Sequence, residues 1–332
     1  MSTRIGINGM GRIGRSFVRI VEGSDLEVVA VNDVTDTRTL AHLLAYDSTY
    51  GRLGLSVDYD EKSLYVDGRR IDATSHRDPR DVPWGSLGVD IVIESTGKFR
   101  QRREAAGHLD SGARKVLLSA PGKGSDHTFV MGINETEYDP ERHDIISNAS
   151  CTTNCVVPMM KVMNDRFGVS KGFMTTVHAY TGDQMILDAP HKDLHRARTA
   201  AVNIIPTSTG AARTVGSVIP ALEGKLDGIA VRVPVEDGSL TDLTLLLQRE
   251  ASVEQVNAAF ADAASHELAG IVRYNEDPIV SRDIMGDSAS CVFDSTLTQA
   301  NAELVKIFGW YDNEWGYTCR LVDLARHVAA RL

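Results

Sequence analysis

The N-terminal segment places three glycines between a strand-like run and a helix-like run. Residues 4–8 (RIGIN) are typical of a short buried strand, and Gly9, Gly11 and Gly14 form a GxGxxG pattern before residues 16–21, whose apolar side chains recur at helical spacing. The first glycine permits a tight turn, the second lets the backbone approach a pyrophosphate, and the third lets helix pack on strand. The pattern predicts a strand–turn–helix unit whose helix N-terminus binds phosphate.

A second strand follows this unit and ends in an acidic residue. Residues 26–32 are rich in valine, and Asp33 comes directly after them, about 20 residues beyond the last glycine. A carboxylate at this position accepts hydrogen bonds from the adenosine ribose and repels a 2′-phosphate. The pattern therefore favours NAD over NADP. The alternative, that Asp33 only caps the next helix, stays open.

Further apolar runs without alternation predict more buried strands. The candidates are residues 89–94, 115–119 and 127–131. Helical stretches such as residues 101–111 separate them, which indicates a parallel sheet covered on both faces. Ser95, Thr96 and Ser119 stand at strand ends, where a dinucleotide would lie, although small polar residues there are more often part of turns.

Length and composition limit the classes of protein that fit. A chain of 332 residues is too long for one core, so two domains are expected. The net charge of −10 disfavours nucleic acid as a partner, because nucleic-acid binding needs a basic face. No apolar run approaches the roughly 20 residues that span a bilayer, so no membrane partner is expected. The four cysteines form no CxxC pair, which favours a reducing, cytoplasmic compartment.

Residues 147–155 (SNASCTTNC) form a polar segment between two apolar ones. Such a segment suits a nucleophile that must reach a substrate, but free cysteines are also among the most buried residues, so both readings remain open for Cys151. If Cys151 begins a helix, the positive end of the helix dipole lowers its pKa. Cys155 then lies one turn inward as a structural residue, and helical spacing disfavours a disulfide between the two.

The second half of the chain supplies polar partners for this cysteine. His178 ends a strand-like run, and a cysteine with a histidine elsewhere in the chain is typical of an activated thiol. Residues 181–209 form a polar, basic segment that serves either as a solvated face or as the wall of a phosphate site. Arg232 lies inside the apolar strand 229–234, where its charge needs a partner such as a phosphate.

The remaining elements predict a second domain of different type. Residues 206–212 (PTSTGAA) are expected to begin a helix whose N-terminus binds an anion. Residues 240–248 predict a strand and residues 253–268 an amphipathic helix. Consecutive strands without intervening helices indicate a mixed or antiparallel α+β domain. Asn313 lies in an aromatic-framed turn before a final helix over residues 318–330; a plain turn residue and an amide that orients a cofactor ring are the two readings.

Taken together, these stretches resemble the phosphorylating glyceraldehyde-3-phosphate dehydrogenase family over essentially the whole chain. The matching motifs stand in family order at family-like separations: IGINGMGRIGR (5–15), SNASCTTNC (147–155), HAYT (178–181), PTSTGAA (206–212), VRVP (231–234) and YDNEWGY (311–317). Several such matches together are highly specific.

The resemblance implies the chemistry and the residues that carry it. The family oxidises glyceraldehyde 3-phosphate to 1,3-bisphosphoglycerate with NAD and inorganic phosphate, through a thiohemiacetal and a thioester. Cys151 is implied as the nucleophile and His178 as its base, and no metal is implied. The implied phosphate-binding residues are Ser150, Thr152, Thr209 and Gly210 for inorganic phosphate, and Thr181, Asp183, Arg196 and Arg232 for the C3 phosphate. The implied NAD-binding residues are Gly9, Gly11, Arg12, Ile13, Asp33, Arg77, Ser119 and Asn313.

The resemblance also implies the fold class and the assembly. The expected fold is α/β, with a Rossmann parallel-sheet NAD domain over residues 1–150 that a C-terminal helix (316–332) completes. An α+β catalytic domain with a mostly antiparallel or mixed sheet is expected over residues 151–315. Four subunits are expected to form a homotetramer, with residues 181–209 packing against a neighbouring subunit's cofactor site.

Four positions depart from common family residues. Gly182 stands where many members carry Asn, His195 where many bacterial members carry Arg, and Arg213 where Lys is common. Ala189 precedes a proline where NAD-specific relatives often carry Leu, which weakens the case against NADP. Three of these positions lie on or near the basic segment. They suggest a specialised isozyme, for example one that tolerates an electrophilic inhibitor aimed at Cys151.

Three alternative functions stand against this one. Erythrose-4-phosphate dehydrogenase is the nearest, but that relative changes the residues after the catalytic histidine and within the PTSTGAA segment. A non-catalytic, NAD-binding regulatory or surface protein is the second, and the intact set of Cys151, His178 and Arg232 argues against it. A thiol-directed hydrolytic or binding module would need neither Asp33 nor the glycine pattern.

Overall fold

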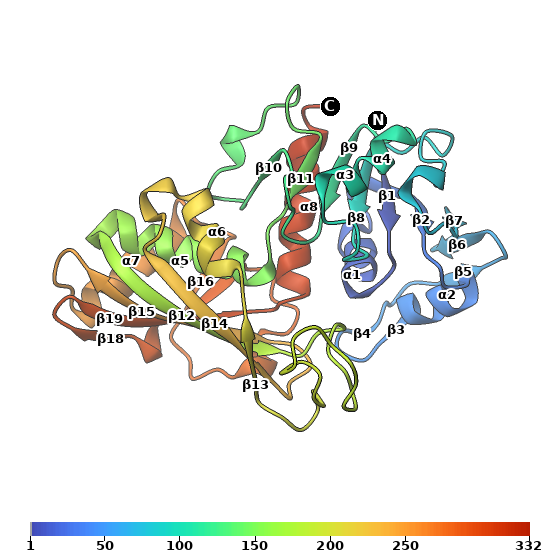
Figure 1. Cartoon of the computed structure of the whole chain (residues 1–332). Helices are drawn as coiled ribbons and strands as arrows, with labels where there is room; N and C mark the ends of the chain where they lie inside the picture. The colour runs from blue at the N-terminus through green and yellow to red at the C-terminus, as the bar shows by residue number, and fades with distance from the viewer. Residues whose placement is uncertain (1) are drawn as a thin grey trace. The chain divides into compact units, whose positions relative to one another are not determined.

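A computed structural model describes residues 2–332, which form two compact units (Figure 1). Unit 1 comprises the residues up to Phe129, Asn134–Ser150 and Thr318–Leu332, and unit 2 comprises Val130–Ile133 and Cys151–Tyr317. The last helix, α8 (Trp315–Ala329), therefore lies mostly in the unit that the N-terminal half builds. Among the described residues, no helix is both long and apolar enough to cross a bilayer.

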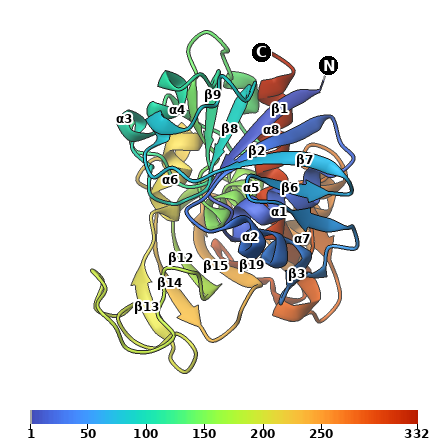
Figure 2. The same cartoon turned by 90° about the vertical axis from the view of Figure 1, so that its right-hand side faces the viewer.

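Unit 1 is built on a nine-stranded sheet in the order β10-β11-β9-β8-β1-β2-β7-β6-β5. Its parallel strands are β1 (Thr3–Asn8), β2 (Leu26–Asn32), β7 (Arg69–Thr74), β8 (Ile91–Glu94), β9 (Lys115–Leu118), β10 (His127–Thr128) and β11 (Ile145–Ser147). Two further strands, β5 (Val57–Tyr59) and β6 (Ser63–Val66), add an antiparallel edge. Figure 2 shows this sheet from β9 through β8, β1 and β2 to β7 and β6.

The central strands of unit 1 are apolar because both of their faces are covered. Ile5, Ile7 and Ile93 are fully buried, as expected for parallel strands between helical layers. The helical segments of this unit are α1 (Arg12–Val21), α2 (Thr37–Ala45), α3 (Arg102–Ala105), α4 (Gly107–Asp110), η1 (Pro79–Asp81) and η2 (Glu135–Glu137), and a small hairpin pairs β3 (Tyr46–Asp47) with β4 (Gly51–Arg52).

Two predicted elements of unit 1 are shorter than the sequence suggested. The helix expected over residues 101–111 is divided into α3 and α4, and the strand expected over residues 127–131 is only the two-residue β10. Gly107 stands at the break, where a Cβ atom would lie 3.1 Å from the Pro79 side chain. The close approach of η1 therefore favours glycine at this position, which no local pattern reveals.

Unit 2 is built on an eight-stranded mixed sheet in the order β13-β14-β12-β15-β19-β17-β16, with β18 paired to β19. The strands are β12 (Val169–Ala179), β13 (Ile205–Ser208), β14 (Leu226–Val233), β15 (Ser239–Leu247), β16 (Val272–Asn275), β17 (Cys291–Asp294), β18 (Gln299–Asn301) and β19 (Leu304–Tyr311). Only the pairs β12/β14 and β16/β17 are parallel. The predicted fold class, a parallel Rossmann sheet plus a mixed α+β sheet, is confirmed.

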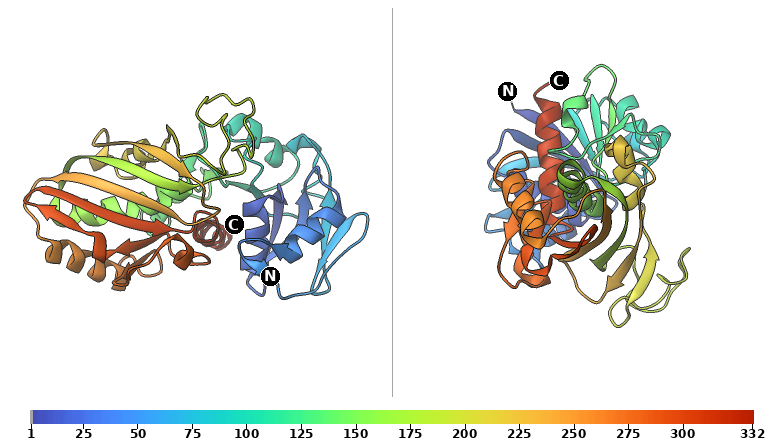
Figure 3. Two further views of the ribbon diagram at one scale, coloured as in Figure 1. Left: turned by 90° about the horizontal axis from the view of Figure 1, so that it is seen from below. Right: turned by 90° about the vertical axis from the view of Figure 1, so that its left-hand side faces the viewer.

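Three helices, α5 (Cys151–Phe167), α6 (Ala211–Val218) and α7 (Val253–Ser265), pack against the sheet of unit 2 and against one another. Short 3₁₀ turns complete the unit: η3 (Pro220–Leu222), η4 (Ser281–Ile284) and η5 (Ser295–Leu297). Seen from below, the strands lie in front of α5 (Figure 3, left). The strands leave large apolar side chains exposed, including Phe173, Ile229 and Leu304. The sheet is therefore covered by helices on one face and open on the other.

The prediction that a helix begins at residue 206 is wrong. Residues 205–208 are strand β13, paired antiparallel with Ile229–Arg232, and the helix begins only at Ala211. Hydroxyl residues before an apolar run are typical of a helix start, but here the neighbouring strand offers them backbone partners instead.

Candidate active site

Cys151 is the first residue of helix α5. The chain reaches this position through Ala149, which has a positive φ of 56°, a conformation that a residue with a side chain rarely adopts. Such strained residues cluster at functional sites, where surrounding contacts hold them. Cys151 is half-buried, whereas Cys155 is fully buried one turn further along; all four cysteines are free thiols.

His178 faces Cys151 from strand β12. The Nε2 atom of His178 lies 3.4 Å from the Cys151 Sγ atom, and Nδ1 lies 2.7 Å from the backbone oxygen of Ala179. Arg232 Nη1 also lies 3.1 Å from Nδ1, but its two hydrogens are directed to the Ala179 oxygen and the Thr181 hydroxyl. A carbonyl oxygen only accepts hydrogen bonds, so Nδ1 carries the hydrogen and Nε2 presents its lone pair to the thiol. The strand thus fixes the tautomer in which the imidazole can accept a proton from sulfur.

The environment of this pair favours its neutral form. Burial raises the pKa of Cys151, although the positive charge of Arg232 and the backbone N–H of Thr152 act in the opposite direction. Burial also lowers the pKa of His178, and Arg232 adds to that lowering. The backbone N–H groups at the helix start do lower the thiol pKa, in the direction that the sequence argument predicted, but desolvation of the thiolate is larger and the net shift is upward.

Arg232 lies beside His178, because β12 and β14 pair in parallel with these two residues opposite each other. Its Nη1 atom donates to the Ala179 oxygen at 3.0 Å and to the Thr181 hydroxyl at 2.9 Å. Its Nε atom is buried and has no hydrogen-bond partner among the described residues. A buried, unsatisfied guanidinium donor is costly, so this site favours an anionic ligand.

Thr181, Asp183 and Arg196 form a connected polar group. The Thr181 hydroxyl donates to Asp183, and Arg196 Nη1 lies 2.5 Å from the other oxygen of the same carboxylate. Arg196 Nε also donates to the Thr207 hydroxyl at 2.9 Å on strand β13. Burial tends to raise the pKa of Asp183, but Thr181 and Arg196 stabilise its ionised form and the net shift is downward. The structure therefore brings together the four residues implied for the C3 phosphate.

The residues implied for inorganic phosphate lie at two helix N-termini. Thr209 and Gly210 precede α6, and the Thr209 hydroxyl accepts a hydrogen bond from the Ala211 N–H at 3.2 Å. Ser150 and Thr152 flank Cys151 at the start of α5. The first backbone N–H groups of a helix have no intrahelical partner, which makes both positions suitable for an anion.

Tyr311 is a functional candidate that the sequence did not reveal. Its hydroxyl lies 2.9 Å from the Thr152 hydroxyl and 2.8 Å from the Thr176 hydroxyl, and its ring meets the His178 ring edge-on at 5.9 Å. These side chains are buried. The sequence signal was its place at the start of the YDNEWGY segment, but Tyr311 and Thr152 are 159 positions apart, so no local pattern shows that their hydroxyls meet.

The Asn313 side chain is connected through the Ser239 hydroxyl to β12, the strand that carries His178. The Ser239 hydroxyl donates to the Asn313 side-chain oxygen at 2.6 Å and accepts from the Ala179 N–H at 3.1 Å. The Asn313 side-chain oxygen is therefore occupied, and its Nδ2 group is the one left to meet a ligand.

Unit 1 contains a separate cavity of about 250 Å³ at the carboxyl ends of its strands. Its lining residues are Asn8, Gly9, Gly11, Asn32, Asp33, Val34, His76, Arg77, Ser95, Thr96, Lys98 and Phe99. Gly9 has a φ of 97°, and a Cβ atom on it would lie 2.8 Å from the Thr96 nitrogen. A Cβ atom on Gly14 would collide with the Gly9 backbone oxygen. Both glycines are thus required by geometry, as the motif predicts.

The residues implied for NAD are distributed unevenly around this cavity. Gly9, Gly11, Asp33 and Arg77 line it, whereas Arg12, Ile13 and Ser119 are outside its lining and Asn313 belongs to unit 2. Asp33 accepts hydrogen bonds from the Met10 N–H at 2.8 Å and from the Thr35 N–H at 2.9 Å, so it also braces the glycine turn. Arg12 forms an ion pair with Asp47.

Comparison with known proteins gives a consistent result over the whole length. Residues 3–102 match the NAD-binding domain of glyceraldehyde 3-phosphate dehydrogenase, and residues 150–313 match its C-terminal domain. The chain belongs to the glyceraldehyde-3-phosphate dehydrogenase family. It is 59% identical to glyceraldehyde-3-phosphate dehydrogenase from Streptomyces coelicolor, with all of both chains covered. It is 53% identical to the enzyme of that name from Geobacillus stearothermophilus, over all of this chain and 99% of the relative.

Membership of this family confirms the prediction of an NAD-dependent dehydrogenase with an NAD-binding N-terminal domain. The glycine pattern lies within the residues that match the NAD-binding domain, and Cys151 and His178 lie within those that match the C-terminal domain.

Proposed function

We propose that this protein oxidises glyceraldehyde 3-phosphate to 1,3-bisphosphoglycerate, with NAD and inorganic phosphate as co-substrates. The observation that carries the proposal is the pairing of Cys151 Sγ with His178 Nε2 at 3.4 Å, with the histidine tautomer fixed by Ala179. The 53–59% identity to curated members of the family supports the same substrate.

In the proposed reaction, the Cys151 sulfur attacks the aldehyde carbon while its proton passes to His178 Nε2. The oxyanion of the resulting thiohemiacetal is stabilised by backbone N–H groups at the start of α5 and by the protonated imidazole. NAD supplies the hydride acceptor. The imidazolium then returns its proton to the oxyanion, which gives the thiohemiacetal hydroxyl and a neutral imidazole. His178 Nε2 accepts this hydroxyl proton again as the carbon gives up its hydride to NAD and the thioester carbonyl forms. Inorganic phosphate then attacks the thioester carbonyl, and the Cys151 sulfur departs with its bonding electrons.

Two phosphate sites follow from the anion-binding groups of unit 2. Arg232 and Thr181, supported by Asp183 and Arg196, are proposed to bind the C3 phosphate, because the buried Arg232 Nε atom has no hydrogen-bond partner within residues 2–332. The N-termini of α6 and α5 are proposed to bind inorganic phosphate. The residues that serve this second site are Ser150, Thr152, Thr209 and Gly210.

NAD is proposed to occupy the cavity of unit 1. Gly9 and Gly11 would approach its phosphates, Asp33 its adenosine ribose, and Arg77 the adenine side of the cavity. Further contacts are proposed from Arg12, Ile13 and Ser119, and the Asn313 amide is proposed to contact the nicotinamide.

We further propose that unit 1 is the NAD domain, that unit 2 is the catalytic domain, and that the protein is a homotetramer. The open sheet face exposes Phe173 at 73%, and the basic segment exposes Ile186 at 80% and Val202 at 76%. Large apolar side chains with this exposure are typical of protein–protein interfaces. Light scattering coupled to gel filtration tests the assembly, and a monomer would refute it.

The four free thiols fit a reducing cytoplasm.

The activity is tested by following NAD reduction at its absorbance band with glyceraldehyde 3-phosphate, with and without inorganic phosphate. A phosphate requirement is expected, and its absence would indicate a hydrolytic dehydrogenase. The Cys151→Ser protein is expected to lose nearly all turnover, since an alkoxide is far less available than a thiolate. Faster turnover of erythrose 4-phosphate than of glyceraldehyde 3-phosphate would favour the alternative dehydrogenase.

We also propose a specialised isozyme that resists electrophiles aimed at Cys151. Gly182 and His195 depart from common family residues, and both are exposed on the segment that contributes Asp183 and Arg196. A Cβ atom on Gly182 would contact nothing within 4 Å, so a larger residue fits there without rearrangement. Packing therefore does not require glycine at position 182, and we propose that the change from asparagine acts on the neighbouring phosphate site.

A further inference from the structure

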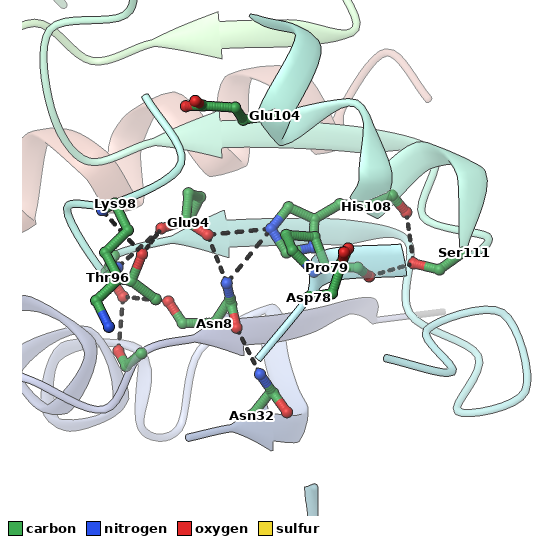
Figure 4. Close-up of polar contacts among 12 residues, drawn as sticks. Asn8, Asn32, Asp78, Pro79, Glu94, Thr96, Lys98, Glu104, His108 and Ser111 are labelled. Carbon is green, nitrogen blue, oxygen red and sulfur yellow. Dashed lines mark hydrogen bonds and ion pairs between the residues drawn. The ribbon is translucent and has the colours of Figure 1, made fainter. Parts of the chain in front are cut away.

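A row of polar side chains crosses the carboxyl edge of the unit 1 sheet beneath the cavity. Glu94, Asn8, Asn32 and Thr74 end four adjacent strands, β8, β1, β2 and β7, and each stands opposite the next in register. Figure 4 shows the Glu94, Asn8 and Asn32 side chains joined in this order. We call these four residues the strand-end ladder.

One end of the ladder is anchored by a buried histidine. Trp84 Nε1 lies 2.9 Å from His108 Nδ1, and His108 Nε2 lies 3.0 Å from Glu94 Oε2. An indole N–H only donates, so His108 Nδ1 must accept, and the hydrogen of the ring sits on Nε2. His108 and Trp84 are completely buried. The tryptophan therefore fixes a neutral histidine that donates to Glu94.

Glu94 is an acceptor on all sides. Its Oε2 atom accepts from His108 and, at 2.5 Å, from Asn8 Nδ2, while its Oε1 atom accepts from the Thr96 N–H at 2.9 Å and from the Thr96 hydroxyl at 2.5 Å. A group that receives four donors is an ionised carboxylate. It is only 3% exposed, and none of these four partners is a cation. Hydrogen bonds alone hold this buried charge.

The charge of Glu94 sets the direction of the Asn8 amide, and the His76 backbone holds the Asn32 amide in the matching direction, because Asn32 Nδ2 also donates to the His76 oxygen at 2.9 Å. Because Asn8 Nδ2 must donate to Glu94, Asn8 Oδ1 faces Asn32 and accepts from Asn32 Nδ2 at 2.7 Å. Asn32 Oδ1 is then turned to the other side, where it accepts from the His76 N–H at 2.8 Å and from the Thr74 hydroxyl at 2.9 Å. One consistent orientation therefore runs from Glu94 across the strands to the segment that contains Arg77, with Glu94 and the His76 backbone holding its two ends.

We propose that Glu94 is a positioning residue for the cofactor. It does not line the cavity, but Asn8, Asn32, His76 and Thr96 do, and each is held by Glu94 directly or through the ladder. The affinity for the dinucleotide thus depends on a carboxylate that never touches it. The inference rests on the proposed assignment of this cavity to NAD.

Replacing Glu94 by glutamine would put a hydrogen-bond donor where the ladder needs an acceptor. A carbonyl oxygen at the Oε1 position still accepts from Thr96, but the new amide nitrogen then faces two donors, Asn8 Nδ2 and His108 Nε2. If the Asn8 amide rotates, its oxygen can accept from the glutamine nitrogen. Asn8 Nδ2 then faces Asn32 Nδ2, so two donors meet at the next pair of strands. If Asn32 rotates as well, the His76 N–H loses its acceptor and the His76 oxygen loses its donor, both beside Arg77.

A compensating variant follows from the same geometry. In the double variant Asn8→Asp/Glu94→Gln, the new carboxylate accepts from the glutamine amide, from Asn32 Nδ2 and from His108 Nε2, which lies 3.5 Å from the present Asn8 nitrogen. Thr96 keeps the glutamine oxygen as its acceptor. The carboxylate then stands at residue 8 on β1 instead of residue 94 on β8, and the Asn32 side chain and the His76 backbone keep their present orientation.

The experiment measures the dissociation constants of NAD and of ADP-ribose by calorimetry on the full-length protein. ADP-ribose lacks the nicotinamide and therefore reports on the cavity of unit 1. Glu94→Gln is expected to weaken both ligands about tenfold, the equivalent of one lost buried hydrogen bond. The kcat at saturating NAD is expected to change less than the dissociation constants. The double variant is expected to recover most of the lost affinity.

The matched control is Asp126→Asn. Asp126 is also a partly buried carboxylate, directly before β10 of the same sheet, and it accepts from the Asp144 and Ile145 N–H groups at 2.9 and 2.8 Å and from Arg102. It lies outside the cavity lining. Thermal unfolding of every variant reports on folding separately. Asp126→Asn is expected to lower thermal stability and leave ADP-ribose binding unchanged.

The proposal is overturned if Glu94→Gln binds ADP-ribose as tightly as the parent protein, or if the double variant binds no better than Glu94→Gln. An unfolded Glu94→Gln protein leaves the double variant as the test, which must then fold and bind. Failure of the parent protein to bind ADP-ribose would instead refute the assignment of the cavity. The two failures are therefore distinguishable.

Discussion

Removing the Tyr311 hydroxyl tests whether the hydrogen bonds beneath the candidate active site stabilise unit 2. Burial raises the pKa of Tyr311, so this hydroxyl keeps its proton and can donate to one threonine while it accepts from the other. Tyr311→Phe keeps the ring and its edge contact with His178 but leaves the hydroxyls of Thr152 and Thr176 without this partner. The two lost hydrogen bonds predict a cost of about 2 kcal/mol in the free energy of unfolding.

A double-mutant cycle separates this effect from packing. Thr176→Val keeps the shape of the side chain and removes one of the two bonds, so it is expected to cost about 1 kcal/mol. The double variant Thr176→Val/Tyr311→Phe is expected to cost about 2 kcal/mol rather than the additive value of about 3, because the shared bond is lost only once. The predicted coupling free energy is therefore about 1 kcal/mol.

The assay is urea unfolding followed by tryptophan fluorescence. Trp310 and Trp315 lie in unit 2 and only Trp84 lies in unit 1, so the signal reports mainly on the unit that contains Tyr311. The slope of the transition must match that of the parent protein for the comparison to hold. Strict additivity of the three free-energy changes would refute the reasoning. A Tyr311→Phe protein whose free energy of unfolding lies within about 0.5 kcal/mol of the parent would also refute it, because substitutions at exposed surface positions have effects of that size.

Three further predictions concern other parts of the chain. Asp33→Asn is expected to raise the ratio of kcat/KM for NADP to that for NAD by about tenfold, because the repulsion of a 2′-phosphate is lost; initial rates with both cofactors measure it, and an unchanged ratio contradicts the proposed role. Burial opposes ionisation of Asp126, but Arg102 and the backbone N–H groups of Ile145 and Asp144 lower its pKa. Its stabilising effect is thus present above the unfolded pKa of about 4 and lost as pH falls through the lower folded value, so the difference in melting temperature between Asp126→Asn and the parent is expected to shrink from pH 5 to pH 3. Gly182→Asn is expected to speed inactivation by a thiol-directed electrophile, and equal inactivation rates of the two proteins would remove the isozyme proposal.

The local motifs of this chain were readable because their requirements are local. Gly9 needs a positive φ, and Gly14 needs room beside the Gly9 oxygen, whatever the rest of the chain does. Strands β1, β2, β8 and β9 were predicted within two residues because parallel strands buried on both faces leave continuous apolar runs. The pairing of Cys151 with His178 was inferred from residue types and the family resemblance, since no local pattern relates residues on a helix and a distant strand.

Other features were decided by partners far away in the sequence. Residues 205–208 resemble a helix start but form β13, because β14 offers them backbone hydrogen bonds. The thiol pKa of Cys151 depends on how deeply folding buries it, and here burial outweighs the helix N-terminus on which the sequence argument relied.

The sequence by itself determined the glycine turn, the two classes of sheet and the residue types of the site. Only the tertiary structure decided which hydroxyls meet Tyr311 and how Glu94 orients the ladder. The physical reason is that turns and strand patterns depend on φ, ψ and side-chain periodicity within a short segment. Hydrogen-bond direction and desolvation depend on groups that the fold brings together from positions as far apart as Thr152 and Tyr311.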